Sequence, residues 1–493
     1  IKYTGTLDSA CTITIGPNTI SRVHLIENAT SGSQNIIIKQ GSGATVTIEP
    51  GHVKMVYLDG AGSGAAVTDA LTQLNLKGPI STTTAGTSNF VAGVNAGNSI
   101  TSGGNYNVVI GDEAGTALTT GDFNVAVGFE ALSTEDADGR NVAVGYQSLK
   151  ALNAGSDGEN TAVGYRAGLS VTTAQDNVFI GASAGDAITE GGDNTVVGRT
   201  ALSADTLGKK STAIGGGVLR SQNFTTATNA YNTAVGFNSG AAVTTGTENT
   251  FMGGNTADSL TVGGENTAIG YNALSVDTKG SKSTAIGRGT LDAQNFTTAT
   301  DSHNTAVGYN AGTQVSTAVS NTLIGSGAGD ALTTGSYSVA VGHNALGSED
   351  TEHNNTAIGY AALATLNGGT RNTAVGQSAG TALTSADNNT LIGTNAGDAL
   401  TEGSDNTAVG FQALTSDTLG TRSVAIGQYA LNNQNFTTST TAYNTAMGYN
   451  AGVSITTGTL NTLIGGLAGD ALTTGFNNVA VGTSALSAED TGR

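Results

Sequence analysis

Two pairs of adjacent carboxylates are the residues whose types could carry catalysis. Glu135 precedes Asp136, and Glu349 precedes Asp350. Glycoside hydrolysis uses two carboxyl groups about 5–10 Å apart across a sugar, so these pairs suggest a polysaccharide-degrading enzyme. Both pairs, however, lie in glycine-rich segments that predict solvated surface turns, and the chain has no Trp to stack on a sugar ring. We therefore expect exposed turns, with no catalytic residues and no enzyme.

Five recurring aspartates are the residues that could bind metal. They are Asp186, Asp258, Asp330, Asp398 and Asp470. Acidic turns bind Ca²⁺ in some solenoids, but these aspartates lie four repeat units apart, or roughly 19 Å along a stack of strands. They cannot share an ion within one chain, so turn capping is the favoured interpretation. The five histidines show no ligand spacing, and we expect no metal site and no cofactor.

Three longer loops carry the sequence Gln-Asn-Phe-Thr-Thr and are candidate contact loops. Their central residues are Asn223, Phe224, Asn295, Phe296, Asn435 and Phe436. We expect these loops to project from the protein, where an aromatic ring flanked by Asn and Thr could bind a surface glycan. The alternative is that each Phe packs against a neighbouring subunit, because a large exposed apolar side chain is unfavourable.

A repeating unit positions all of these residues. A five-residue pattern recurs 22 times: Asn or Ser, then Thr or Val, then any residue, then Val, Ile or Met, and finally Gly. The spacing is 17 residues in all but four of the 21 intervals; it is 19 after Gly145 and 21 after Gly215, Gly287 and Gly427. We number each unit from its Asn or Ser as position 1, so that the glycine is position 5. A degenerate unit at 89–93 precedes the series.

Each column of the repeat carries its own expectation. Position 1 is Asn in 18 units and Ser in four, which predicts a ladder of stacked, hydrogen-bonded Asn side chains. Position 2 is Thr fifteen times and Val seven times, as expected of a half-buried site. Position 3 is mostly Ala and bulkier every fourth unit, and position 4 is always Val, Ile or Met, which we take as an inward core column. The invariant glycine predicts a positive φ or a close backbone approach.

The unit predicts one coil of a parallel β-solenoid. Five residues with strand character end in a turn, and a second apolar patch such as Ala273–Leu274 suggests a second short strand. The predicted fold is all-β: a solenoid of about 23 coils over residues 89–493, a linker over 69–88, and a small antiparallel β-sandwich over 1–68. Its expected strands are Cys11–Ile15, Ile20–Ile26, Asn35–Lys39, Ala44–Ile48 and Val53–Leu58.

Composition narrows the function classes. The formal net charge of −19 argues against nucleic acid as a partner, since such a surface needs clustered Lys and Arg, and against anionic membranes. Cys11 is the only cysteine, so no disulfide forms within the chain. No apolar run approaches the roughly 20 residues that span a bilayer, and we expect no membrane insertion.

The coils predict self-association. Each unit carries few large side chains, so a single slender solenoid has a thin core. Burying the Ala or the Thr/Val face against other copies would remedy this, and we expect a homotrimer. Flat Thr arrays also bind ice, but the seven Val residues that interrupt the Thr column argue against that function.

The repeat resembles those of known fibre proteins. The stretch NTAVGYNAG…TTG…NTLIG at 444–465, as repeated over 89–493, is similar to shaft repeats of bacteriophage tail fibres and tail spikes and to the head repeats of trimeric autotransporter adhesins. The stretches TGTLDSACTITIG and ENATSGSQNIIIKQGSGATVTIEPGHVKMVYLDG look like a small β domain of marine phage tail proteins.

The resemblance implies a trimeric virion fibre that contributes to host attachment. Its partners would be other copies of the chain, virion tail or other particle proteins, and a host surface glycan or receptor. A bacterial trimeric surface adhesin is the alternative, and a polysaccharide-degrading tail spike is the third hypothesis. Because the sequence ends at Arg493 in mid-coil, we expect the natural protein to continue.

Overall fold

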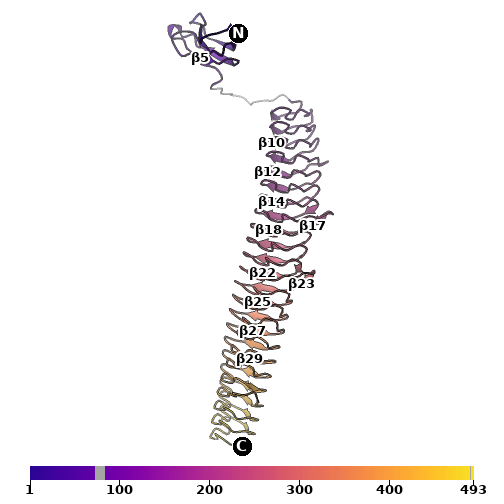
Figure 1. Ribbon diagram of the computed structural model, residues 1–493, viewed down its shortest axis with the longest axis vertical. Helices are drawn as coiled ribbons and strands as arrows, with labels where there is room; N and C mark the ends of the chain where they lie inside the picture. Colours follow the sequence, from indigo (N-terminus) through magenta and orange to yellow (C-terminus); the bar gives the residue numbers. More distant parts are fainter. Residues whose placement is uncertain (73–83, 489, 493) are drawn as a thin grey trace. The chain divides into compact units, whose positions relative to one another are not determined.

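The computed structural model describes residues 1–72, 84–488 and 490–492. The chain divides into two compact units, Ile1–Ser81 and Thr82–Arg493. Most of the expected linker, residues 73–83, lies outside the described residues. Figure 1 shows the first unit as a small β domain and the second as a stack of similar coils.

The first unit is a small β domain with two sheets around one core. Its sheets have the strand orders β1-β3-β6-β7 and β2-β4-β5. Both contribute to a core that includes Ile26, Ile38, Ile48 and Leu58. The elements are β1 (Lys2–Thr6), β2 (Cys11–Thr14), β3 (Arg22–Ser31), β4 (Ile36–Lys39), β5 (Val46–Ile48), β6 (Val53–Leu58), a 3₁₀ turn at Gly62–Gly64 and β7 (Val67–Asp69).

The pairing in this domain is mixed rather than antiparallel throughout. β3 pairs antiparallel with β6, and β4 with β5, but β1 runs parallel to β3 and β2 parallel to β4. The five strands expected from sequence are present, Val53–Leu58 with the expected bounds and the other four with shifted ends, whereas β1 and β7 were not expected. Both are short outer strands that lack a clear run of apolar alternation.

The second unit is a parallel β-solenoid, as predicted. In its described residues 23 three-residue strands pair in parallel along the chain, each with the strand of the preceding and the following coil, from β8–β9 to β35–β36. The strands are β8 (Phe90–Ala92), β9 (Val108–Ile110), β10 (Val125–Val127), β11 (Val142–Val144), β12 (Thr161–Val163), β13 (Val178–Ile180), β14 (Thr195–Val197), β16 (Thr212–Ile214), β18 (Thr233–Val235), β19 (Thr250–Met252), β20 (Thr267–Ile269), β22 (Thr284–Ile286), β24 (Thr305–Val307), β25 (Thr322–Ile324), β26 (Val339–Val341), β27 (Thr356–Ile358), β28 (Thr373–Val375), β29 (Thr390–Ile392), β30 (Thr407–Val409), β32 (Val424–Ile426), β34 (Thr445–Met447), β35 (Thr462–Ile464) and β36 (Val479–Val481).

The rest of each coil consists of turns. The apolar patch Ala273–Leu274 is buried, but it lies in a turn and not in the second strand that we expected. In the described residues, short strands are added where each 21-residue coil meets the 17-residue coil before it, and one strand from each coil pairs into a two-stranded ribbon. The pairs are β15 (Gly208–Lys209) with β17 (Thr228–Asn229), β21 (Gly280–Ser281) with β23 (Thr300–Asp301), and β31 (Gly420–Thr421) with β33 (Thr440–Thr441).

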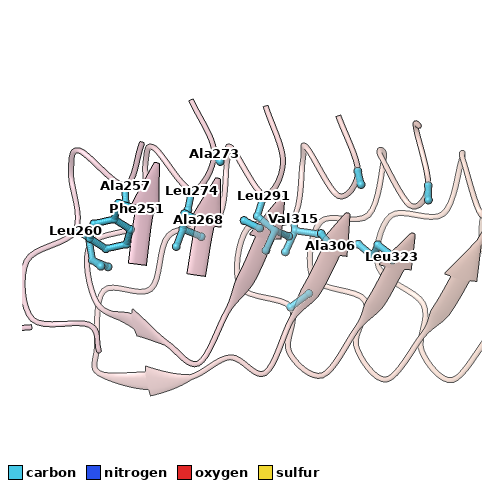
Figure 2. Packing of buried hydrophobic residues seen from close by; sticks show 14 of the residues in the cluster. Phe251, Ala257, Leu260, Ala268, Ala273, Leu274, Leu291, Ala306, Val315 and Leu323 are labelled. Carbon is cyan, nitrogen blue, oxygen red and sulfur yellow. The ribbon is translucent and has the colours of Figure 1, made fainter. Parts of the chain in front are cut away.

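The core of the solenoid is built from small and medium apolar side chains. Position 3 of the strand points inward and is Ala in most coils, with Phe or Leu at intervals, as in Phe251 and Leu323. Leucines and alanines from the turns fill the remaining space, as Figure 2 shows for Leu260, Leu274 and Leu291. This arrangement explains why a coil of 17 residues can enclose a dry core with few large side chains.

The position 1 ladder is confirmed. The side-chain amide of Asn266 donates to Gly280 O at 2.9 Å, and its Oδ1 accepts from the Ser283 backbone N–H, also at 2.9 Å. The Asn266 backbone N–H in turn donates to Asn249 Oδ1. The ladder therefore supplies backbone partners inside the solenoid, where water cannot.

The invariant glycine has both features that the sequence predicted. Gly270 has a φ of +131°, and a Cβ built on it would lie 2.4 Å from the carbonyl oxygen of Gly287 in the next coil. Any side chain at position 5 would push adjacent coils apart.

Candidate functional site

The outward face of the long sheet is the first candidate site. Because side chains alternate along a strand, positions 2 and 4 share one face while position 3 points into the core. Position 2 is half-buried in nearly every coil, as the Thr/Val alternation predicted, and position 4 is at least as open, with Met252 49% exposed and Val163 37% exposed.

The expectation that position 4 is an inward core column is therefore wrong. The inward column is position 3, which we had considered as a face for other copies. Ala at position 3 fits the narrow interior because turn leucines already fill it, so the bulkier Val, Ile and Met point outward. The outward face thus combines a Thr/Val row with a Val/Ile/Met row, and no charged residue occupies either row in the 22 units.

The three long loops form the second candidate site. Phe224, Phe296 and Phe436 are each only 5% exposed. The backbone N–H of Phe224 donates to Asp205 Oδ1, and its carbonyl accepts from Thr206 Oγ1. The rings are thus buried within their own chain, and the expectation that they project to a glycan or to a neighbouring subunit is wrong.

Other parts of these loops remain accessible. Asn223 and Asn435 are exposed, Asn295 is half-buried, and the Thr residues that follow each Phe are exposed. The Asn223 side chain accepts a hydrogen bond from Thr206 Oγ1 at 3.0 Å. The loops stay candidate contact surfaces through their Asn and Thr side chains.

The two carboxylate pairs are not the solvated turns that we expected. Glu135 and Glu349 are fully buried, whereas Asp136 is exposed and Asp350 is half-buried. Both glutamates occupy position 12 of their coils, where most other coils place Leu, Val or Ile. Each pair has one buried and one outer member, so neither forms the facing carboxyls of a glycosidase.

Position 12 also carries a polar network that we did not predict. Gln222 Nε2 donates to Asp205 Oδ2 at 2.6 Å and to Ser211 Oγ at 3.0 Å, and Asn232 Nδ2 donates to Gln222 Oε1 at 2.8 Å. The same contacts recur at two other places along the solenoid. They join Asp277, Ser283, Gln294 and Asn304, and Asp417, Ser423, Gln434 and Asn444.

Serine in the Asn ladder was the sequence signal for this network. All four serines at position 1 share a coil with Gln or Glu at position 12. The shorter serine leaves room for the longer side chain to reach the ladder and replace the missing amide. Burial raises the pKa of Asp205 and of Asp417, and hydrogen bonds from Gln222 and Gln434 oppose that rise.

Glu349 takes the place of the glutamine in the coil that begins at Ser338. Its carboxyl oxygens lie 3.4 Å from Ser338 Oγ and 3.0 Å from Asn355 Nδ2, both of which can donate. Burial raises the pKa of Glu349 to about 8, and that of Glu135 to about 7. A carboxyl that prefers to be protonated near neutral pH would make the stability of the solenoid depend on pH.

The five recurring aspartates are half-buried on turns. Burial raises the pKa of Asp186, and a side-chain hydrogen bond from Ser183 opposes the shift. Asp398 accepts a hydrogen bond from Thr415 Oγ1. Within the described residues these aspartates belong to no cluster of metal-ligating groups.

An apolar face on the N-terminal domain is the third candidate site. Val23 and Leu25 on β3 and Val53 on β6 are each more than half exposed, and Tyr57 on β6 is 39% exposed. The antiparallel register places Val23 opposite Tyr57. This face is suited to contact another protein, because clustered exposed apolar side chains favour association.

Comparisons with known proteins do not assign the chain to a family. No family model matches the chain, and no curated protein and no solved structure is significantly similar to it. Among the described residues, no helix has the length and hydropathy needed to cross a membrane.

Proposed function

We propose that this chain is the trimeric shaft of a fibre on a phage virion, a structural protein that contributes to host-cell attachment and not an enzyme. The observation that carries the proposal is the uncharged outward face of the solenoid sheet. Its Thr/Val row and its Val/Ile/Met row continue over the coils without a charged residue, which favours close contact with other long, equally regular surfaces.

The size of this face supports burial between copies. Strands about 4.8 Å apart and side chains about 7 Å apart along each strand make a strip of at least about 700 Å² over 23 coils. A standard interface buries about 800 Å² per partner, so the strip is of the right order for a permanent contact.

A closed assembly of three copies suits the shape of the strip. Identical rows along each solenoid can meet around one axis parallel to the stack, and a closed cyclic arrangement leaves no outward face unpaired. The resemblance of the repeats to those of trimeric fibres favours three. The Asn- and Thr-bearing loops then serve as repeated weak contacts for a host glycan or receptor, which gain avidity by repetition.

The N-terminal domain provides the attachment to the particle. Its exposed apolar residues Val23, Leu25, Val53 and Tyr57 would contact a virion tail or other particle protein. The chain would accordingly be found in the virion, as part of a tail or other surface fibre.

The oligomeric state tests the assembly. Multi-angle light scattering on the full chain should give three times the chain mass. Replacing Met252 and Ile324 on the outward face with Glu should yield monomers, since six carboxylates would meet at the interface. The matched control replaces Val262 and Val276 with Glu. These two residues are exposed to a similar degree but lie outside the strands, so this variant should remain trimeric. A stable monomer of the unmodified chain at micromolar concentration would refute the trimer.

Labelling tests the location. Gold-conjugated antibodies against the solenoid should decorate fibres projecting from purified virus particles. Labelling of a bacterial surface instead would assign the chain to trimeric adhesins. Release of reducing sugar from a host polysaccharide by the purified protein would assign it to degrading tail spikes.

A further inference from the structure

Three carboxylates meet in the coil that begins at Asn124. Glu135, Asp136 and Asp138 each have an oxygen within 4.8 Å of the others. Glu135 is fully buried, Asp138 half-buried and Asp136 exposed, so the group extends from the core to the surface. In the part of the chain that the structure describes, none of the ion pairs includes any of the three.

The buried member of the group keeps one oxygen without a hydrogen bond. Glu135 Oε1 accepts from the backbone N–H of Asp138 at 3.2 Å, but the buried Oε2 has no hydrogen-bond partner, and neither does the buried Oδ2 of Asp138. Leaving a buried carboxylate oxygen unsatisfied is unfavourable, because its desolvation is not compensated. A cation that contacts both oxygens would satisfy them, beside the Ala154 backbone N–H, whose interaction with the Glu135 carboxyl lowers its pKa.

The equivalent carboxylates in other coils are satisfied by the chain itself. Position 12 holds Asp205, whose Oδ2 accepts from Gln222 and whose Oδ1 accepts from the backbone of Gly208 and Phe224. At the same position Glu349 is bonded by Ser338 and Asn355.

Glu135 differs because its coil has Asn at position 1. Asn124 keeps its own ladder bonds, to Asn107 through its backbone and to Asp138 O through its amide. Glu135 therefore cannot enter the ladder as Glu349 does. Its carboxyl is left beside the two aspartates that follow it.

We propose that Glu135, Asp136 and Asp138 bind a divalent cation, of which Ca²⁺ fits best. Ca²⁺ takes oxygen ligands at about 2.4 Å, so oxygens sharing one ion lie at most about 4.8 Å apart, as these do. Carboxylates without His or Cys select hard cations, and the irregular loop suits Ca²⁺ better than Mg²⁺, which demands near-ideal octahedral geometry. The site is independent of how the chains assemble.

A bound ion would fasten this loop to the neighbouring coil. The carbonyl of Asp136 already accepts from the Thr119 backbone N–H of the preceding coil, and Asp138 O accepts from Asn124. Holding the three side chains in place would fix both contacts. The cation is thus a local clamp near the N-terminal end of the solenoid.

Calorimetric titration of the full chain with CaCl₂ after removal of divalent ions tests the proposal. In 0.15 M NaCl, which screens surface charges, we expect one Ca²⁺ per chain that is lost in Glu135→Gln and in Asp138→Asn. Glu349→Gln, the matched control at the same coil position, should bind Ca²⁺ as the unmodified chain does.

A second variant guards against misfolding. Glu135→Leu continues the buried column of Leu118 and Leu152, the residues at position 12 in the coils before and after, so it should fold and still bind no Ca²⁺ at this site. Unchanged Ca²⁺ binding in Glu135→Leu, or no binding to the unmodified chain at millimolar Ca²⁺, would overturn the proposal and leave a protonated carboxyl as the explanation.

Discussion

The ring of Phe179 occupies the space that a side chain at Gly185 would need. A Cβ built on Gly185 would lie 2.3 Å from Phe179 Cε1. The relation recurs eight and twelve coils later, with Gly329 against Leu323 and Gly397 against Leu391, at 2.7 and 2.8 Å. Positions 3 and 9 therefore share one volume within the coil.

Many coils with Ala at position 3 use the opposite arrangement, with Leu at position 9. Ala126 is paired with Leu132, and Ala340 with Leu346, and all four are fully buried. Leu132 adopts a φ of +52°, close to the +57° of Gly185, so the backbone at position 9 accepts either residue. The four-coil period of the sequence is the period of this exchange.

Combining a small residue at position 3 with a large one at position 9 should therefore restore the stability that each substitution alone removes. Phe179→Ala should destabilise by about 3–5 kcal/mol through cavity formation, and Gly185→Leu alone by about 1–3 kcal/mol through overpacking. The double variant recreates the pair Ala126–Leu132 and should recover at least half of the combined loss. Hydrogen exchange of the amides around residues 160–200, with thermal unfolding, measures the coupling. Additive losses would show that the two positions do not share a volume.

The features that depend on a single coil could be predicted from the sequence. The 17-residue period, the Asn ladder and the position 5 glycine follow from which residues recur at a fixed distance. The direction of positions 3 and 4 could not, because Ala and Val are both apolar and only the volume of the turn leucines decides which fits inside. The burial of Glu135 was missed because we considered its neighbours in sequence and not the leucines 17 residues before and after it.

The ladder predicts a large effect from a small change. Asn266→Ala leaves the Ser283 N–H and the Gly280 carbonyl without the side-chain partners that Asn266 supplies, at about 1–3 kcal/mol for each buried group. We expect a clearly lower melting temperature and faster amide exchange in the two adjacent coils. Asn229→Ala, an exposed change on β17, is the control. Equal melting temperatures for both variants would argue against a structural ladder.

The long loops allow packing and recognition to be separated. Replacing Phe224, Phe296 and Phe436 with Ala should lower the melting temperature and expose the loops to protease, since the rings are buried in their own chain. Replacing Asn223, Asn295 and Asn435 with Ala should leave stability nearly unchanged and weaken cell binding. If cell binding survives the Asn replacements, the loops are not the contact surface.

Glu349 predicts a defined pH dependence. Burial raises its pKa from the usual 4.5 to about 8 in the folded chain. Below pH 4.5 the carboxyl is protonated in both states, and this contribution to stability is complete. Between pH 4.5 and about 8 the unfolded chain releases the proton while the folded chain retains it, so stability falls as pH rises, by at most about 1.4 kcal/mol per pKa unit.

Glu349→Gln should remove this contribution. The amide can donate to Ser338 and accept from Asn355, as Gln222 does with Ser211 and Asn232. Melting temperatures from pH 5 to 9 should therefore fall less steeply for the variant, which becomes the more stable protein at pH 9. The reciprocal change, Gln222→Glu, brings a second carboxyl beside Asp205 and should steepen the fall. Parallel melting curves for the unmodified chain and Glu349→Gln would mean that Glu349 is ionised in the folded solenoid, with its charge balanced by Ser338 and Asn355 alone.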